Sequence, residues 1–108
     1  MKTIVETLGK KNIIFKSLKH IEPKSLGTKK QIGIYLGTKL DNYYAIVLYV
    51  ERKSRILSKD VEDYIALHHK VEGYNESKIY KKYIIIHAPL CSKAKAKLLE
   101  FGWRVFEI

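Results

Sequence analysis

The sequence predicts a single α/β domain over residues 1–108, a mixed central β-sheet flanked by helices, with the elements in the order α-β-β-β-α-β-α-β. Three observations support this prediction. The 108 residues suffice for one core and leave no room for a second. Hydrophobic residues make up 46% of the chain and lie in blocks between Lys, Gly and Ser clusters, which is typical of a folded protein. Helical and strand-like patterns alternate along the chain, which favours a sheet covered by helices on both faces.

The first two elements are a short helix and a strand. Apolar residues with helical spacing predict a helix within residues 2–10 that ends near Gly9 or Asn12. Residues 12–21 are rich in strand-forming residues and then alternate in polarity, so we expect a first strand there. Pro23 closes this strand because it cannot donate a hydrogen bond to a sheet.

The next two apolar blocks, residues 31–36 and 43–50, predict the strands of an antiparallel hairpin. Residues 37–42 separate them and contain Gly37 and the pair Asp41-Asn42, whose chemistry is typical of turns. The second block is apolar at successive positions, and therefore on both faces of a strand. We expect it to be a central strand of the sheet.

The second half of the chain predicts a helix, a strand, a helix and a strand. Ser58 can cap a helix whose first turn is acidic, and apolar residues then recur at helical spacing as far as Gly73, which ends it. The apolar run at residues 83–88 before a proline is a buried strand. Residues 92–101 form a second helix that a glycine ends, and residues 103–108 form the last strand.

The net charge of the chain restricts its partners. The formal charge is +10 with a pI near 9.7, which creates a positive field that attracts polyanions. Nucleic acid is the leading partner, with DNA favoured over RNA, although a general lysine bias in composition also explains part of the charge. No apolar run is long enough to span a bilayer and no signal-peptide pattern begins the chain, so we expect a cytoplasmic protein without a membrane partner.

Glu51 and Lys53 lie at the end of the central apolar strand. In a strand over residues 43–53 the side chains alternate between the two faces, so these two residues share one face. Phosphodiester cleavage needs a carboxylate to hold a divalent metal and a cation to orient the attacking water. A Glu-x-Lys pair supplies both groups side by side.

The stretch Val50-Glu51-Arg52-Lys53-Ser54-Arg55 resembles the E-x-K-S-R strand end of archaeal Holliday-junction resolvases, within the PD-(D/E)XK (restriction-endonuclease-like) nuclease superfamily. The order of elements is similar to that family over nearly the whole chain. The resemblance implies an endonuclease that cleaves DNA phosphodiesters with Mg²⁺ (or Mn²⁺), in which Glu51 holds the metal and Lys53 orients water. It also implies a homodimer, because resolvases act as symmetric dimers on two-fold junctions.

One position departs from the family pattern. The family's metal-binding Asp sits at the start of the preceding strand, where this chain has Gln31, whose side-chain oxygen is neutral. Glu6 resembles a Glu that some resolvases place on the first helix to complete the metal site, and Glu22 is a further candidate. Asp41 lies at the opposite end of a regular hairpin and is a poor substitute. The resemblance therefore gives Glu51, Lys53 and Gln31 as catalytic residues, and Glu51 and Glu6 as metal ligands.

Several basic residues are candidates for phosphate contacts around this motif. Lysines in the first turns and in the loop before the hairpin are expected on the motif side of the sheet, together with an arginine of the motif and a lysine that opens the following helix. These residues are Lys10, Lys11, Lys24, Lys29, Lys30, Arg55 and Lys59.

Other interpretations of the same residues stay open. A charged stretch at a strand end is also typical of a solvated edge, and the missing Asp is compatible with a degenerate fold that binds nucleic acid without cutting it or that supports a catalytic partner. His87, at the end of a buried strand, is a candidate general base for metal-independent RNA cleavage, although an edge histidine is the commoner case. The four histidines show no spacing typical of zinc ligands.

Overall fold

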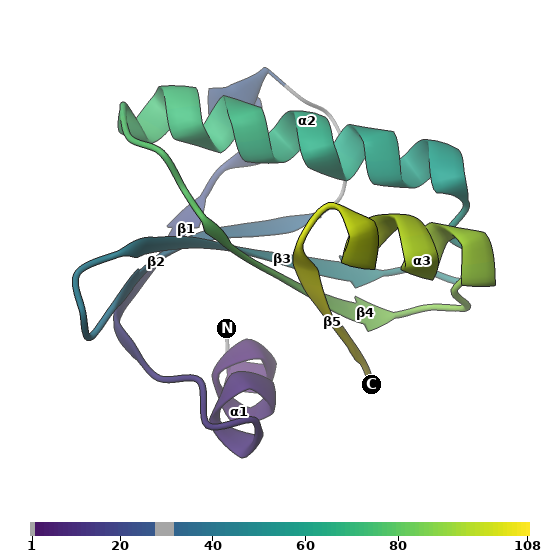
Figure 1. Cartoon of the computed structure of the whole chain (residues 1–108), viewed down its shortest axis with the longest axis horizontal. Coiled ribbons are helices and arrows are strands. Elements are labelled where there is room, and N and C mark those ends of the chain that lie inside the picture. Colours follow the sequence, from purple (N-terminus) through teal and green to yellow (C-terminus); the bar gives the residue numbers. More distant parts are fainter. Residues whose placement is uncertain (1, 28–31) are drawn as a thin grey trace.

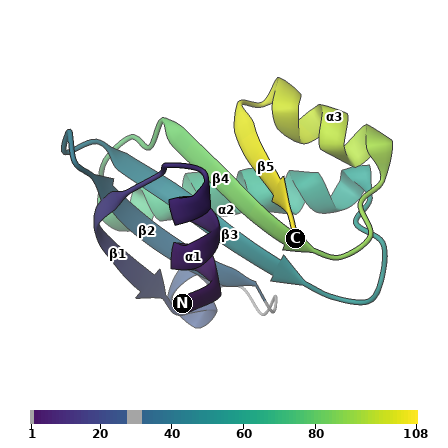
Figure 2. The same cartoon turned by 90° about the horizontal axis from the view of Figure 1, so that it is seen from below.

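The chain forms a twisted sheet with helices on both sides, shown in a computed structural model that describes residues 2–27 and 32–108 (Figure 1). Figure 2 gives the view from below, in which α1 crosses in front of the sheet. The elements in these described residues are α1 (Lys2–Lys10), β1 (Phe15–Ile21), the short 3-10 helix η1 (Pro23–Leu26), β2 (Gly33–Lys39), β3 (Tyr44–Glu51), α2 (Ser58–Asn75), β4 (Lys81–His87), α3 (Ser92–Glu100) and β5 (Trp103–Glu107).

Within the described residues, the strands lie side by side in the order β1-β2-β3-β4-β5. The first three strands pair antiparallel, as a meander, and β4 and β5 then join parallel to β3. The parallel pairs arise because α2 and α3 return the chain to the opposite end of the sheet before the next strand begins. The predicted fold class and the order α-β-β-β-α-β-α-β are confirmed, with η1 added between β1 and β2.

Two hydrophobic layers hold the helices to the sheet. α2 and α3 cover one face, where Leu48 of β3 packs in a cluster with Val61 of α2, and α1 covers the other face (Figure 1). On that second face Ile4 and Leu8 of α1 join Val47 of β3 in a separate cluster. β3 is therefore buried on both faces, as predicted for a central strand. No helix among residues 2–27 and 32–108 is both long and apolar enough to cross a membrane.

The ends of the first two strands differ from the prediction. β1 begins at Phe15, not at residue 12, because Asn12 takes a left-handed backbone with φ of 59° in the turn after α1. β2 continues through Gly37 to Lys39, which the sequence placed in the turn. A Cβ atom at Gly37 would lie 2.7 Å from the Phe15 ring, so this glycine is required for packing inside a strand and not for a turn.

The ends of α2 also differ from the prediction. Leu57, not Ser58, occupies the position before the first helical residue, and its backbone N–H donates to the Asp60 carboxylate at 2.8 Å. At the other end the helix passes Gly73 and ends at Asn75. Glu76 takes the left-handed conformation expected of a terminal glycine, with φ of 54°, and its N–H donates back to the Gly73 carbonyl.

Candidate active site

The carboxyl ends of β3 and β4 bring Glu51 and His87 together. The two strands are parallel neighbours, and the two residues are direct partners in the register. Earlier residues of β3 at alternate positions, Val47 and Tyr49, belong to the layer under α1, so Glu51 faces the α1 side of the sheet. The side chains of Glu51 and His87 are 62% and 58% exposed, and both are open to a ligand.

Glu51 accepts two contacts on one oxygen. His87 Nδ1 lies 3.1 Å from Glu51 Oε2, and the Tyr49 hydroxyl donates to the same oxygen over 3.5 Å. Burial and the adjacent Glu51 charge both raise the pKa of Tyr49, so its phenol stays protonated and acts as a donor at neutral pH. No sequence pattern predicts this pairing, because only the parallel register places His87 beside Glu51.

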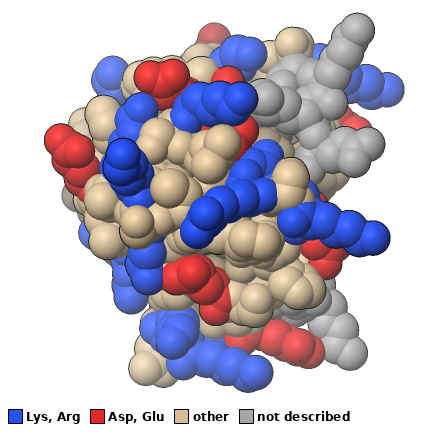
Figure 3. Space-filling view, turned by 90° about the vertical axis from the view of Figure 1, so that its right-hand side faces the viewer, with Lys and Arg blue, Asp and Glu red and all other residues tan. Residues whose placement is uncertain are grey.

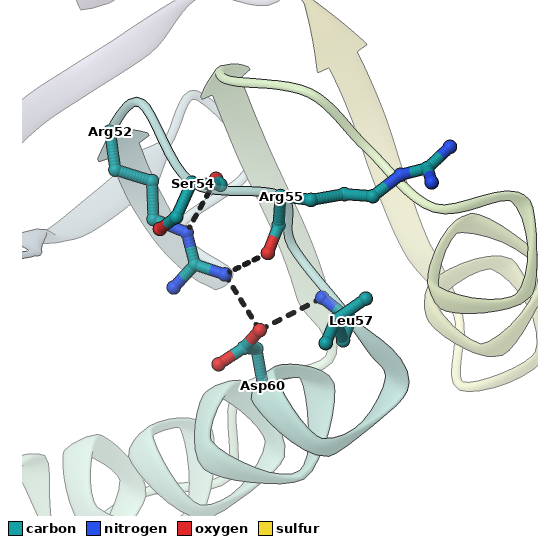
Figure 4. A network of polar contacts seen from close by, with 5 residues as sticks. All are labelled: Arg52, Ser54, Arg55, Leu57 and Asp60. Atoms are coloured by element: carbon teal, nitrogen blue, oxygen red, sulfur yellow. Dashed lines mark hydrogen bonds and ion pairs between the residues drawn. The ribbon is translucent and has the colours of Figure 1, made fainter.

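Arg52 points to the other side of the sheet and is held by protein atoms (Figure 4). Its Nε donates to the Ser54 carbonyl at 3.1 Å, and its Nη2 donates to the Arg55 carbonyl at 2.6 Å and to Asp60 Oδ2 at 2.7 Å. The same Asp60 oxygen accepts the Leu57 N–H. This network fixes residues 52–57 against the first turn of α2.

The charges in this network stabilise each other. Partial burial acts to raise the pKa of Asp60, but the hydrogen bonds from Arg52 and from the Leu57 N–H outweigh it and lower that pKa. The hydrogen bond to Asp60 raises the pKa of Arg52. Both groups are therefore ionised at neutral pH.

Lys53 does not share a strand face with Glu51, which corrects the prediction. β3 ends at Glu51, and Lys53 lies in a bend with an exposed side chain. The strand ends there because Arg52 is held toward α2 by its bonds to residues 54, 55 and 60. The chain returns to the sheet at Ile56, which forms an isolated parallel bridge with Leu90. Lys53 therefore lies in a short loop at the edge of the Glu51 site.

A hollow of about 270 Å³ lies beside this loop on the α2 side. Its lining combines Arg52 with the acidic residues Asp60 and Asp63 and a buried tyrosine, Tyr64, with a pKa that burial raises to about 12, and Glu51 borders it at the end of β3. The lining residues are Ile32, Val50, Glu51, Arg52, Asp60, Asp63 and Tyr64. Asp60 and Asp63 were not predicted as site residues, although their spacing on the first turns of a helix was a signal that both carboxylates share one face.

The other predicted metal ligands, Glu6 and Glu22, do not complete a group of three ligands with Glu51 and His87 among the described residues. Glu6 on α1 and Glu22 after β1 are both exposed. In the described part of the chain, no third His, Cys, Asp or Glu ligand atom forms a compact group with Glu51 and His87. Gln31 lies outside the described residues, as do Lys29 and Lys30.

The predicted phosphate contacts divide between the two ends of the sheet. Arg55 and Lys59 lie at the Glu51 end, and so does Lys24, because η1 follows the end of β1. Lys10 and Lys11 precede the start of β1, whose first residue pairs with the last residue of β2, so they lie at the opposite end, which corrects the prediction. Figure 3, from the side where the β3 and β4 arrowheads lie in Figure 1, shows Lys and Arg spread over this face with acids between them.

A histidine cluster on α2 is structural. His68, His69 and Glu72 place one ligand atom each within 4.8 Å of the others, although the sequence showed no zinc spacing. However, His68 Nε2 contacts the Ile79 carbonyl at 2.7 Å, and Glu72 accepts the Ile79 N–H at 2.8 Å. Burial lowers the pKa of His68, which favours its neutral form. The cluster fastens the segment before β4 to α2.

Comparisons with known proteins give the fold a context. No protein-family model matches the sequence, and no curated protein matches it. Solved structures with the same fold include EndoMS in its apo form, with a TM-score of 0.61 and 17% sequence identity over 99% of this chain and 44% of that chain. A complex of EndoMS with dsDNA has a TM-score of 0.57 and 14% identity, over 100% of this chain and 42% of that chain. A repair endonuclease from Pyrococcus abyssi has a TM-score of 0.56 and 15% identity, over 100% of this chain and 45% of that chain. At such identities the similarity establishes the fold, and the chain spans less than half of each of these proteins.

Proposed function

We propose that this chain is an endonuclease domain of the PD-(D/E)XK type that cleaves DNA at the edge formed by Glu51 and His87. The observation that carries the proposal is the open pair of Glu51 Oε2 and His87 Nδ1, 3.1 Å apart at the carboxyl ends of adjacent parallel strands. The E-x-K-S-R motif supports it, and so does a fold shared with a protein described as a repair endonuclease and with EndoMS in a complex with dsDNA.

The Glu51 and His87 pair fits a divalent cation. Two neighbouring ligands of an octahedral ion, each about 2.1 Å from it, lie about 3 Å apart. The Oε2–Nδ1 contact of 3.1 Å is a hydrogen bond whose length is close to this value, so an ion bound by both atoms would take the place of the proton between them. Because one donor is an imidazole nitrogen, we propose Mn²⁺ or a similar transition-metal ion ahead of Mg²⁺. Such an ion, when bound, supplies positive charge to the phosphate and a more acidic water.

The chain's own residues orient and neutralise the substrate in this proposal. Lys53 and Arg55, both exposed in the loop after β3, contact the phosphates on either side of the cleaved bond. Lys59 on the first turn of α2 and Lys24 on η1 extend the contact along the backbone. Tyr49 holds the Glu51 carboxylate through its hydroxyl, which keeps that oxygen on the His87 side.

Cleavage assays on single-site variants test the proposal. The wild-type protein is incubated with duplex, branched and single-stranded DNA in Mg²⁺ or Mn²⁺, beside Glu51→Gln, His87→Ala and Lys53→Ala. We expect a loss of at least about 100-fold for Glu51→Gln and about 10- to 100-fold for Lys53→Ala. His87→Ala should remove the preference for Mn²⁺. Glu100→Gln, an exposed carboxylate at the far end of α3, is the matched control and should cleave normally. Equal cleavage by all these proteins, or no cleavage by any of them, would reject the proposed nuclease activity.

A second candidate is a nucleic-acid-binding module, or a subunit supporting a catalytic partner, on the same fold. It is favoured by the lack, among the described residues, of a third ligand beside Glu51 and His87. Calorimetry with Mn²⁺ separates the two candidates, because the module binds DNA but has no metal site that Glu51→Gln removes. Junction specificity and a homodimer are further proposals from the motif, and light scattering and branched substrates test them.

A further inference from the structure

A second basic region lies at the end of the sheet opposite to Glu51. Two neighbouring hollows of about 350 and 230 Å³ share Lys39 and Arg104 in their walls. The β2–β3 turn and the segment between α1 and β1 lie together at this end (Figure 2). The cations that line the hollows are Lys11, Lys39, Lys81, Lys82 and Arg104.

Three of the five cations of this groove contact neutral groups. Lys39 Nζ donates to the Tyr83 hydroxyl at 3.4 Å, and Lys82 Nζ donates to the Phe101 carbonyl. Arg104 lies over the rings of Tyr83 and Phe106, at 5.9 and 5.5 Å from their centroids. Within residues 2–27 and 32–108, none of the five cations forms an ion pair with a carboxylate. These neutral contacts orient Lys39, Lys82 and Arg104, and the charges of all five cations stay available to an anion.

Other cations of the molecule behave differently. Lys95 pairs with Glu107 at 2.8 Å, and Lys97 pairs with Glu62 at 3.3 Å. Asp41 is the acid that lines the groove among the described residues, and its carboxylate accepts the Tyr43 N–H within the β2–β3 turn. The groove therefore concentrates unneutralised positive charge in one hollowed surface.

Tyr80 adds an aromatic surface to the groove. It lines the smaller hollow beside Lys81 and is 72% exposed, the highest fraction among the large hydrophobic residues of the described part of the chain. Grooves that combine cations with exposed aromatic rings bind single-stranded nucleic acid, because the cations follow the phosphates and bases stack on the rings. We propose that this groove binds a single strand of nucleic acid, with phosphates on Lys11, Lys39 and Lys81 and a base on Tyr80.

The proposed groove is separate from the Glu51 edge. Lys81 and His87 mark the two ends of β4, which at about 3.3 Å per residue are about 20 Å apart. The groove does not depend on cleavage, so binding without any divalent metal tests it alone. If the groove did not bind a single strand, the proposed nuclease activity could still hold. If the protein did not cleave DNA, the proposed binding at the groove could still hold.

Fluorescence anisotropy with a short labelled single strand, in buffer with EDTA, tests the groove. The triple variant Lys11→Gln/Lys39→Gln/Lys81→Gln is compared with Lys19→Gln/Lys70→Gln/Lys78→Gln, which removes the same charge from exposed positions outside the groove. We expect the groove variant to bind about 10- to 100-fold more weakly, with a log–log salt slope shallower by about two. The control should stay near wild type. The double variant Lys11→Gln/Lys81→Gln serves if the triple variant is poorly folded by circular dichroism.

Tyr80 variants complete the test. Tyr80→Ala should weaken binding of the single strand about 10-fold, while Tyr80→Phe, which keeps the ring, binds as wild type. Duplex of the same sequence should respond less to Tyr80→Ala. Equal weakening by the groove and control triples would overturn the site, since net charge alone would then explain binding. Tyr80→Ala without effect on the single strand would overturn the assignment to unpaired bases.

Discussion

Glu51 and Arg52 are adjacent in the sequence, lie on opposite faces of the sheet and have opposite surroundings. Arg52 gives three hydrogen bonds to carbonyls and to Asp60, and its side chain is 31% exposed. Glu51 is 62% exposed and contacts His87 and Tyr49, side chains that a ligand can displace. Strand alternation therefore separates a structural residue from a candidate catalytic one within a single dipeptide.

The difference between the two residues shows how the edge of the sheet is organised. The Arg52 network joins the end of β3 to the first turn of α2, and it thereby fixes the backbone that carries Glu51. The Glu51 and His87 pair is left open on the other face. A rigid anchor on one face and an exposed pair on the other suit a site whose geometry is set before the ligand arrives. The free energies of unfolding of single-site variants should therefore differ between residues on the two faces.

Removal of the Arg52 side chain should have the largest effect on stability. Arg52→Ala removes the charged partner of Asp60 and the donor to two carbonyls, and we expect the free energy of unfolding to fall by about 2 kcal/mol. Urea denaturation measures the change. Arg55→Ala is the matched control, because only the carbonyl of Arg55 takes part in the network, and it should change stability by less than about 0.5 kcal/mol. Similar losses in both variants would refute an anchoring role for Arg52.

Replacement of Asp60 should have the next largest effect. Asp60→Asn keeps the size of the side chain but removes the charge that holds Arg52 and the Leu57 N–H, so we expect a loss of about 1 kcal/mol. Glu62→Gln removes an exposed acid from the same helix turn and should cost less than about 0.5 kcal/mol. A double-mutant cycle with Arg52→Ala should show coupling, and strict additivity would argue against a shared network.

Much of the fold could be predicted from the sequence because periodicity determines which face of each element is apolar. The order of elements and the burial of both faces of β3 followed from this pattern. The ends of elements did not, because tertiary contacts set them. Gly37 has turn chemistry, yet it lies inside β2 under the ring of Phe15. Glu76 ends α2 where the composition favoured Gly73.

The candidate site could be predicted only in part. Glu51 lies at the strand end as predicted. Lys53 was predicted on the same face because the alternation of side chains was extended beyond Glu51, but the strand ends there, where Arg52 bonds to Asp60. Lys11 was placed at the wrong end of the sheet, although the antiparallel meander puts the start of β1 beside the end of β2. His87 beside Glu51 needed the parallel register, which sequence patterns do not contain.

Acid should weaken the anchor of Arg52. The pKa of Asp60 is lower in the folded chain than its ordinary value near 4, so its ionised form adds stability that is fully present above pH ~4. That stability is lost as the pH falls through the lower folded pKa. The difference of about 1 kcal/mol between wild type and Asp60→Asn should therefore shrink toward zero in urea titrations at progressively lower pH. A difference that stays constant under acid would show that the charge of Asp60 is not what stabilises the loop.

The Glu51 and His87 pair should contribute least to stability, and this small effect is the sharpest test of the comparison. Both side chains are more than half exposed, and exposed polar contacts add little free energy because water and salt screen them. We expect Glu51→Gln and His87→Ala to change the free energy of unfolding by less than about 0.5 kcal/mol in urea. If either variant lowered the free energy of unfolding as much as Arg52→Ala does, the replaced residue would belong to the structural anchor. A residue that is dispensable for folding but required for cleavage or metal binding has a role toward a ligand, and these two measurements on the same proteins identify it.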